Sequence, residues 1–315
     1  MDTQIELASR RGRAATCVYV VGMHRSGTSA AAELLARLGL GTPPSDDLIP
    51  ATKSNQHGHW ESKRLVAFNH RLLAHLGGDW TAPAELTPGW QADPTLDNLR
   101  AEASALFAAT FASRPVAWKD PRLCIVLPFW QTVVDQPVGA VFVYRDPLEV
   151  ASSLEARDGL RRTHALALWE RYVRAACSSL EGIPTLAADY HRVLDHPATW
   201  CEELVEFLSV LGISVSPGGD DATHDSLDSE LRHHRGTRRG LGSLSDSAQG
   251  VMDVLRPLQG PHHPWRAPEF EAEPAWVSDV LGMRLELETL RRARREFEAS
   301  RAHRLVSWIH RQAPT

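Results

Sequence analysis

The sequence is poor in cysteine and has no long apolar run, and both absences limit what the chain can be. Four cysteines occur in 315 residues, none of them in a C-x-x-C pair, so no disulfide framework is predicted and a reducing, cytoplasmic compartment is expected. No segment approaches the roughly 20 apolar residues that span a bilayer. Residues 1–15 lack the apolar core of a signal peptide. We therefore expect no transmembrane segment and no signal peptide.

An excess of positive charge is also missing. The formal net charge is -5 at pH 7, which argues against nucleic acid as a partner. The histidines show no spacing typical of metal ligands, so no metal is expected. What remains is an ordinary globular composition, with 43% hydrophobic and 23% charged residues, in a chain long enough to bury a large core.

Short β-branched runs alternate with amphipathic segments along most of the chain. Strands are predicted at 16–21, 115–118, 138–144 and 184–188, and helices at 30–38, 65–76, 95–112, 147–157, 164–181 and 197–211. This alternation predicts an α/β fold with a central parallel sheet flanked by helices. We expect a flexible N-terminus at 1–15, a core at 16–213, a polar loop region or lid at 214–275, and a C-terminal helical extension at 276–315, mostly one basic helix.

A glycine-rich loop, Gly22-Met-His-Arg-Ser-Gly-Thr-Ser29, joins the first strand to the first helix. Its G-x-x-x-x-G spacing is that of a P-loop, in which backbone N–H groups and a helix N-terminus bind an anion. A nucleoside triphosphatase has lysine directly after the second glycine. This chain has Thr28 there and carries its cation earlier, at Arg25. The loop predicts a P-loop-type three-layer fold that binds a phosphate-like anion without a metal.

Arg145 ends the third predicted strand, and Ser153 follows eight residues later. A guanidinium fork suits a phosphate, and a hydroxyl adds one more donor. Residues of these types suit a phosphate, and Ser152 competes with Ser153 for the role of the hydroxyl. The alternative is that Arg145 pairs with Asp146 or Glu149.

Together, the loop and the Arg145–Ser153 pair resemble the sulfotransferases that use 3'-phosphoadenosine-5'-phosphosulfate (PAPS), in particular the bacterial carbohydrate and small-molecule type. The resemblance covers residues 16–210 and implies that 16–213 is a PAPS-binding core. It implies that the 5'-phosphosulfate is held by Arg25, Ser26, Gly27, Thr28 and Ser29. It also implies that the 3'-phosphate is held by Arg145 and Ser153, and that Tyr190 helps to hold the adenine or the loop.

A lysine after the second predicted strand extends the resemblance. Lys119 stands in Trp118-Lys-Asp-Pro-Arg122, where family members have a lysine that faces the transferring sulfuryl group. With Arg25, it would neutralise charge on the sulfonate oxygens and on the leaving phosphate. The alternative is a surface lysine paired with a carboxylate. Arg122 could orient the acceptor or the cofactor.

The segment after the first predicted helix carries the candidate general bases. Asn55, Gly58 and Glu61 match an N-x-x-G-x-x-E stretch of the family. By that resemblance Glu61 is the first candidate to take the acceptor's proton, and His59 and His57 are the alternatives. Glu61 could instead cap a helix over 62–76.

The implied reaction is metal-independent transfer of a sulfuryl group to a hydroxyl of a carbohydrate, glycolipid or other small molecule, with release of 3',5'-adenosine bisphosphate. A P-loop kinase and a non-catalytic nucleotide-binding protein are the alternatives. Trp60 and Trp80 could line the acceptor pocket or belong to the core, and His24 could touch phosphate or be packed.

Two basic segments have open roles. Arg235, Arg238 and Arg239 lie in the expected lid, where they could close over the 3'-phosphate or remain solvated. The C-terminal helix could pack on the core, form a homodimer or make a peripheral membrane contact.

Overall fold

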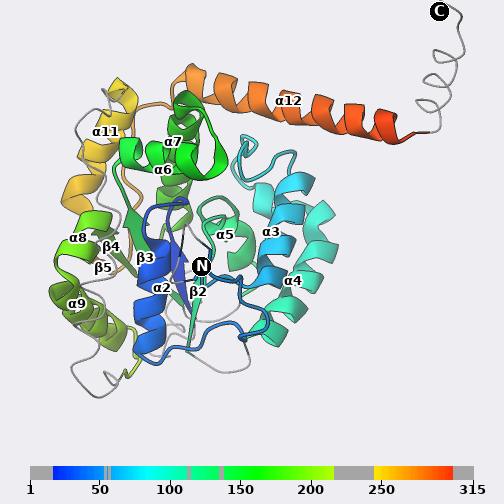
Figure 1. Cartoon of the computed structure of the whole chain (residues 1–315). Helices are drawn as coiled ribbons and strands as arrows, with labels where there is room; N and C mark the ends of the chain where they lie inside the picture. Colours follow the sequence, from blue (N-terminus) through cyan, green and yellow to red (C-terminus); the bar gives the residue numbers. More distant parts are fainter. Residues whose placement is uncertain are drawn as a thin grey trace, which may run out of the picture.

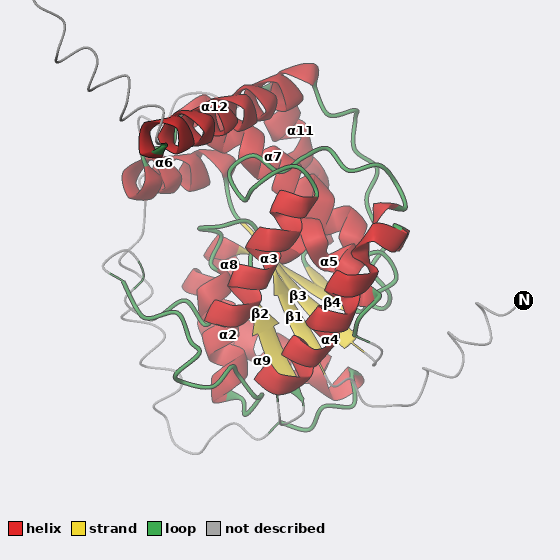
Figure 2. Cartoon of the chain, turned by 90° about the vertical axis from the view of Figure 1, so that its right-hand side faces the viewer, coloured by secondary structure: helices red, strands yellow, loops and turns green. Residues whose placement is uncertain are grey.

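A five-stranded sheet forms the centre of the protein. The computed structural model describes residues 17–52, 55, 58–111, 115–134, 138–215 and 245–300. The sheet order is β2-β1-β3-β4-β5. Strands β1 to β4 run parallel (Figure 2), and β5 pairs antiparallel with β4. The strands are β1 (Cys17–Val21), β2 (Val116–Lys119), β3 (Val138–Tyr144), β4 (Thr185–Asp189) and β5 (Gly260–His262).

Helices cover both faces of this sheet. One face packs against α2 (Thr28–Arg37), α8 (Tyr190–Asp195) and α9 (Pro197–Val210). The other packs against α3 (Lys63–His75), α4 (Asp97–Thr110), α5 (Leu123–Gln131), α6 (Pro147–Asp158), α7 (Arg162–Ser179), α11 (Asp246–Leu255) and the start of α12 (Ala275–Ala299). Figure 1 shows α9 and the α3–α4 pair on opposite sides of the sheet. The predicted α/β fold with flanking helices is confirmed.

The strands are buried on both faces, which explains their continuous apolar sequences. In β1, Val18 and Val20 face the side covered by α2, whereas Tyr19 and Val21 face the side covered by α5 and α7. Every residue of β1 is buried. The strand therefore carries no alternating polar pattern, and its β-branched content is what identifies it in the sequence.

Two helical segments and a strand differ from the sequence-based expectation. The sequence predicts no helix at α5. Seven of its nine residues are buried, so the segment is apolar on nearly every side. Its sequence therefore lacks the 3.6-residue hydrophobic period by which a helix is recognised. Helix α11 and strand β5 lie within 214–275, where the composition predicts a loop. Ser245 caps α11 by accepting a hydrogen bond from the Ala248 N–H, and Val251 and Leu255 are buried in the core.

Several predictions fall on residues that the structure does not describe. These are the flexible N-terminus at 1–15, the candidate base His57, the basic stretch with Arg235, Arg238 and Arg239, and the last part of the helical extension expected at 276–315. None of the described helices is long and apolar enough to cross a membrane.

The strand order determines where a ligand can bind. From β1 the chain crosses to β2 on one side, and from β2 it returns to β3 on the other side of β1. In a parallel sheet, helices that leave in opposite directions open a crevice at this switch point, outside the carboxyl ends of the strands. The glycine-rich loop follows β1 and Arg145 follows β3, so both motifs lie at this crevice.

Gly22 fixes the start of the loop against β3. A Cβ at this position would lie 2.2 Å from the carbonyl oxygen of Val143 and 2.8 Å from Cγ2 of Thr28, so only glycine lets the two backbones approach. The chain offers a matched comparison in Gly39, which follows α2 with φ of +94° and where an added Cβ would meet no atom within 4 Å.

We predict that Gly22→Ala lowers the free energy of unfolding by about 3 kcal/mol, because backbone must move to admit the methyl group. Gly39→Ala should cost only about 1 kcal/mol, the cost of a left-handed conformation for an L-residue. Urea denaturation of the two variants measures both values. Equal losses of unfolding free energy in the two variants would show that the backbone at Gly22 does not pack tightly against β3.

Candidate active site

The glycine-rich loop ends where α2 begins, with Gly27 as its N-cap in a left-handed conformation (φ 93°). The first N–H groups of α2 have no intrahelical partners and carry the positive end of the helix dipole. Inside the loop, the Ser26 N–H donates to the Met23 carbonyl (3.1 Å). The Ser26 side chain is fully buried, and its hydroxyl has no hydrogen-bond partner among the described residues. A helix N-terminus with such free donors is an arrangement that can bind an anion.

Tyr190, at the end of β4, packs directly on the loop. A Cβ at Gly27 would lie 2.4 Å from Cδ2 of the Tyr190 ring, and the Arg145 guanidinium lies over the same ring, 4.0 Å from its centroid. The ring therefore separates the loop backbone from the end of β3 and positions both. The family resemblance implies a role for Tyr190 at the adenine or the loop, and the structure puts it against the loop.

The two predicted phosphate motifs are joined by hydrogen bonds. Arg25 donates from Nε to the Ser153 hydroxyl at 2.7 Å, and Arg145 donates from Nη1 to the Arg25 carbonyl at 3.1 Å. Ser153, on the second turn of α6, therefore links the Arg145 motif, to which it belongs, to the glycine-rich loop. Arg25 is in the left-handed region (φ 69°), a conformation that a non-glycine residue adopts at a cost of about 1–3 kcal/mol and mostly at functional sites.

Positive charge accumulates at this point. Burial lowers the pKa of Arg25, and the nearby guanidinium groups of Arg157 and Arg145 lower it further. Arg157 is a site residue that sequence reasoning missed. It lies one helical turn after Ser153 on the same face of α6, so the i, i+4 spacing was the available signal. Its guanidinium lies 5.8 Å from the centroid of the Trp80 ring.

Arg145 is also held by an acidic neighbour, as the alternative interpretation expected. Its Nε donates to Glu149 at 2.8 Å, and the other carboxylate oxygen of Glu149 meets His191 Nε2 at 2.9 Å. The hydrogen bond with Glu149 raises the pKa of His191. Burial alone would raise the pKa of Glu149, but the bonds from His191 and Arg145 outweigh it and lower that pKa. The pairing fixes the Arg145 side chain beside the loop.

A second charged cluster lies at the end of β2. Lys119 is 3% exposed and Glu61 is 5% exposed. Lys119 Nζ donates to Glu61 Oε1, and Arg122 Nη1 reaches Glu61 Oε2 at 3.3 Å. Arg122 also binds Asp120 at 2.8 Å, and Asn69 donates to the second oxygen of Asp120 at 2.9 Å. Lys119 is therefore a buried, paired cation rather than a surface lysine.

The ion pairs in this cluster shift the pKa values of Arg122 and Asp120. Burial alone would lower the pKa of Arg122, but Asp120 and Glu61 outweigh it and raise that pKa. Burial alone would raise the pKa of Asp120, but Arg122 and the hydrogen bonds from Asn69 and the Arg122 backbone lower it. Arg122 and Asp120 are thus held in their charged forms, and both Lys119 and Arg122 contact Glu61.

Glu61 does not cap α3. That position belongs to Ser62, whose hydroxyl accepts from the Leu65 N–H at 3.1 Å. The preceding residue, Trp60, has a left-handed backbone (φ 58°), and this turn places the Glu61 side chain toward Lys119. The alternative interpretation, in which Glu61 caps this helix, is wrong.

His24 and His59 both have lowered pKa values and are neutral near pH 7. His24 is buried, with its ring 4.8 Å from Trp80, and burial followed by the charge of Arg122 lowers its pKa well below the usual value. His59 is half-buried and meets the Thr52 hydroxyl at 3.3 Å. Burial and Lys119 lower the pKa of His59, so its neutral form can accept a proton.

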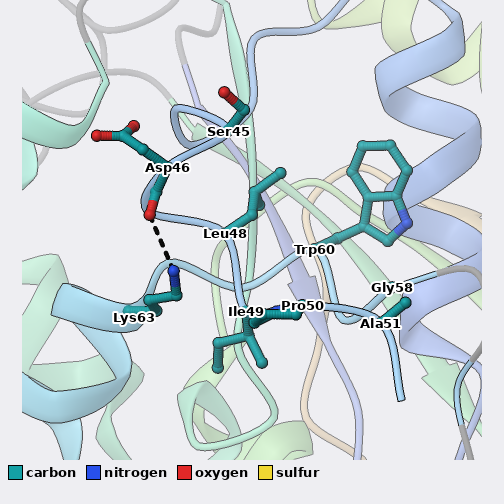
Figure 3. A pocket seen from close by; sticks show the side chains of 9 residues that line it. All are labelled: Ser45, Asp46, Leu48, Ile49, Pro50, Ala51, Gly58, Trp60 and Lys63. Carbon is teal, nitrogen blue, oxygen red and sulfur yellow. Dashed lines mark hydrogen bonds between the residues drawn. The ribbon is translucent and has the colours of Figure 1, made fainter. Parts of the chain in front are cut away.

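A pocket of about 340 Å³ opens beside this segment. Figure 3 shows Leu48, Ile49, Pro50 and Trp60 around it, with Lys63 donating to the Asp46 carbonyl at its edge. The Ile49 N–H donates to the Glu61 carbonyl at 2.8 Å. The wall of the pocket is therefore directly connected to the backbone of Glu61. Asn55 lies on the same segment and donates to the Ser29 hydroxyl at 3.1 Å.

No protein-family model and no curated protein sequence matches the chain. Three similar solved structures are the sulfotransferase domain from the curacin biosynthetic pathway (13% identity, 76% of this chain and 97% of that one, TM-score 0.47), the sulfotransferase domain from the Synechococcus PCC 7002 olefin synthase (15%, 87% and 96%, 0.40), and sulfotransferase STF1 from Mycobacterium tuberculosis H37Rv (14%, 81% and 80%, 0.38). All three are sulfotransferases. At these sequence identities and TM-scores, the likeness carries no argument about the function of this chain.

The raised pKa of His191 makes one part of the site sensitive to pH. A raised pKa in the folded state stabilises the protein below the unfolded value of about 6.5, and this contribution is lost as the pH rises through the raised value. We predict that His191→Gln lowers the free energy of unfolding most near pH 6, and progressively less toward pH 9. Denaturation series at several pH values measure the difference. In a Glu149→Gln background most of this pH dependence should disappear, and its persistence there would contradict the pairing.

Proposed function

We propose that the protein is a PAPS-dependent sulfotransferase that acts on a hydroxyl of a carbohydrate, glycolipid or other small molecule. The observation that carries this proposal is the convergence of Arg25, Arg145 and Arg157, whose charges add to the effect of burial in lowering the pKa of Arg25. Guanidinium groups that repel one another in a partly buried site favour a ligand with several negative charges. The site lies at the switch point of the sheet, where nucleotides bind in α/β folds.

The glycine-rich loop would hold the 5'-phosphosulfate. Its groups are the N–H donors at the start of α2, the hydroxyls of Ser26, Thr28 and Ser29, and the Arg25 side chain. The buried Ser26 hydroxyl fits this use, because a donor without a partner is costly unless a ligand supplies an acceptor. When bound, PAPS would supply the sulfuryl group, which leaves its phosphate and joins the acceptor oxygen.

The 3'-phosphate would be bound by Arg145 and Ser153. The hydrogen bond from Arg25 to Ser153 supports a shared site, in which Arg25 reaches between the two phosphate positions. Arg157 adds a third cation on the same face of α6. Tyr190 would hold Arg145 in place and present the edge of its ring to the nucleoside. Because ATP has no 3'-phosphate, this half of the site distinguishes PAPS from ATP.

The Lys119–Glu61–Arg122 cluster would perform the transfer. Glu61 would accept the proton of the acceptor hydroxyl while the acceptor oxygen attacks sulfur in line. Lys119 and Arg122 orient the carboxylate, and Lys119 with Arg25 would neutralise the negative charge that develops on the leaving phosphate. His59, kept neutral by burial and Lys119, is the alternative base. The pocket beside Trp60 would receive the acceptor.

Cofactor binding can be tested by calorimetry with two nucleotides. We expect Arg145→Ala to weaken binding of 3',5'-adenosine bisphosphate by about 10- to 100-fold, since a charge-assisted bond to phosphate is lost. Binding of 5'-AMP, which lacks the 3'-phosphate, should change by less than about threefold.

Arg37→Ala is the matched control for this test. Arg37 lies at the far end of α2 and pairs with Glu33, so its loss removes the same charge without touching the site. Equal losses of affinity for both nucleotides in Arg145→Ala would contradict the assignment of Arg145 to the 3'-phosphate.

Catalysis can be tested by following label from PAPS into a panel of saccharide, glycolipid and small-molecule hydroxyls. We expect Glu61→Gln to lower kcat by about 100-fold or more through loss of the base, and Lys119→Met by a similar factor through loss of charge stabilisation. Affinity of Glu61→Gln for 3',5'-adenosine bisphosphate should stay within about threefold of wild type, which also shows that the variant folds. Full turnover in Glu61→Gln together with loss in His59→Ala would make His59 the base.

A further inference from the structure

The last helix begins packed on the core and ends exposed. At the start of α12, Val277 and Leu281 are buried, and the segment is tied to α7 by an ion pair between Arg171 and Glu273 (2.6 Å). Arg171 also donates to the Ser278 hydroxyl at 2.8 Å. Beyond Leu281 no described residue of α12 is buried, and Figure 1 shows the helix extending away from the body.

The exposed part carries an apolar stripe with a coiled-coil period. Met283, Leu287, Leu290 and Phe297 are 63%, 42%, 63% and 52% exposed, far more than is usual for large apolar side chains. Trp276 and Val280, which pack partly on the core, and Arg294 complete the series. Its positions are then 276, 280, 283, 287, 290, 294 and 297, spaced alternately by four and three residues. This is the a/d seam of a heptad repeat, with Val280, Leu287 and Arg294 at a and the others at d.

The charges beside the seam select one arrangement of two helices. Asp279 and Glu286 occupy g positions, and Arg284 and Arg291 occupy e positions. In a parallel pair each g residue faces the e residue five positions later on the other helix. Asp279 would then face Arg284 of the second copy, and Glu286 would face Arg291. An antiparallel pair would instead bring acid against acid and arginine against arginine.

The overall charge of the helix does not favour a membrane. From Ala275 to Ala299 it contains five arginines and five carboxylates, so its charges cancel. An interfacial helix that docks on anionic lipid has a polar face rich in lysine and arginine. The observed pattern has complementary charges at fixed positions instead, which a second copy of the same helix can match.

We propose that the protein forms a homodimer through a parallel two-stranded coiled coil of α12. The seam from Met283 to Phe297 makes the apolar contact, and the g–e pairs set the direction and the register. A single charged residue at an a position, here Arg294, fits a dimer, because its side chain can reach solvent past two helices. This assembly is independent of the sulfotransferase proposal and would exist without PAPS.

Sedimentation equilibrium of the full chain tests the dimer. Wild type should sediment as a dimer at micromolar concentration, and the double substitution Leu287→Asp with Leu290→Asp should raise the dissociation constant at least about 100-fold. Arg292→Glu, at the f position opposite the seam, is the matched control and should leave the dimer intact. Wild type that stays monomeric at about 100 µM, or a dimer that survives the double substitution, would overturn the proposal.

Charge exchange tests the parallel direction. Glu286→Arg and Arg291→Glu should each weaken the dimer about tenfold, because each creates like charges across the seam. Both substitutions in one chain should restore it, since the pair is then only reversed. Single variants as stable as wild type would exclude the parallel arrangement. Monomeric wild type that floats with phosphatidylglycerol vesicles would assign the stripe to a membrane and overturn the dimer.

Discussion

Buried positive charge at the carboxyl edge of the sheet is the constraint on which the rest of the structure depends. Lys119, Arg122 and Arg145 are each less than one-tenth exposed, and a cation removed from water is costly unless it is neutralised. The fold supplies Glu61, Asp120 and Glu149 as partners. Arg25 donates to the Ser153 hydroxyl, and burial, followed by the charges of Arg157 and Arg145, lowers its pKa.

The parallel order of the strands brings the charged groups of the site together. Strands β1, β2, β3 and β4 end side by side, and each is followed directly by part of the site: the glycine-rich loop, the Lys119 segment, Arg145 and Tyr190. Parallel strands bring all four ends to one edge. The close approach of Gly22 to Val143 and of Gly27 to Tyr190 then holds the loop near Arg145. The positive cluster thus follows from topology together with two glycines.

Much of this could be predicted from local sequence. The four parallel strands, the βα units and the loop motif have short-range signals, and the predicted helix at 197–211 differs from α9 by one residue at its end. The signals for α5, α11 and β5 failed for different reasons. Helix α5 is buried on nearly all sides, while α11 and β5 lie next to a polar stretch whose composition resembles a loop.

Contacts between distant residues could not be predicted in the same way. Nothing local in the sequence links Glu61 to Lys119, or His191 to Glu149, because the partners are 58 and 42 residues apart. Arg157 did have a local signal, its place one turn after Ser153. The heptad stripe of α12 is visible in the sequence, but its exposure becomes clear only when the helix is seen to leave the body.

Binding of a nucleotide by its 3'-phosphate distinguishes the proposed site from that of a kinase, and a comparison of two isomers tests this most directly. 3',5'-Adenosine bisphosphate and ADP have the same composition and differ in where the second phosphate is attached. Calorimetric titration of the wild-type protein with each should give at least about 100-fold tighter binding of the bisphosphate, since only its 3'-phosphate can reach Arg145 and Ser153. Equal affinity, or tighter binding of ADP, would contradict the sulfotransferase proposal and favour a kinase.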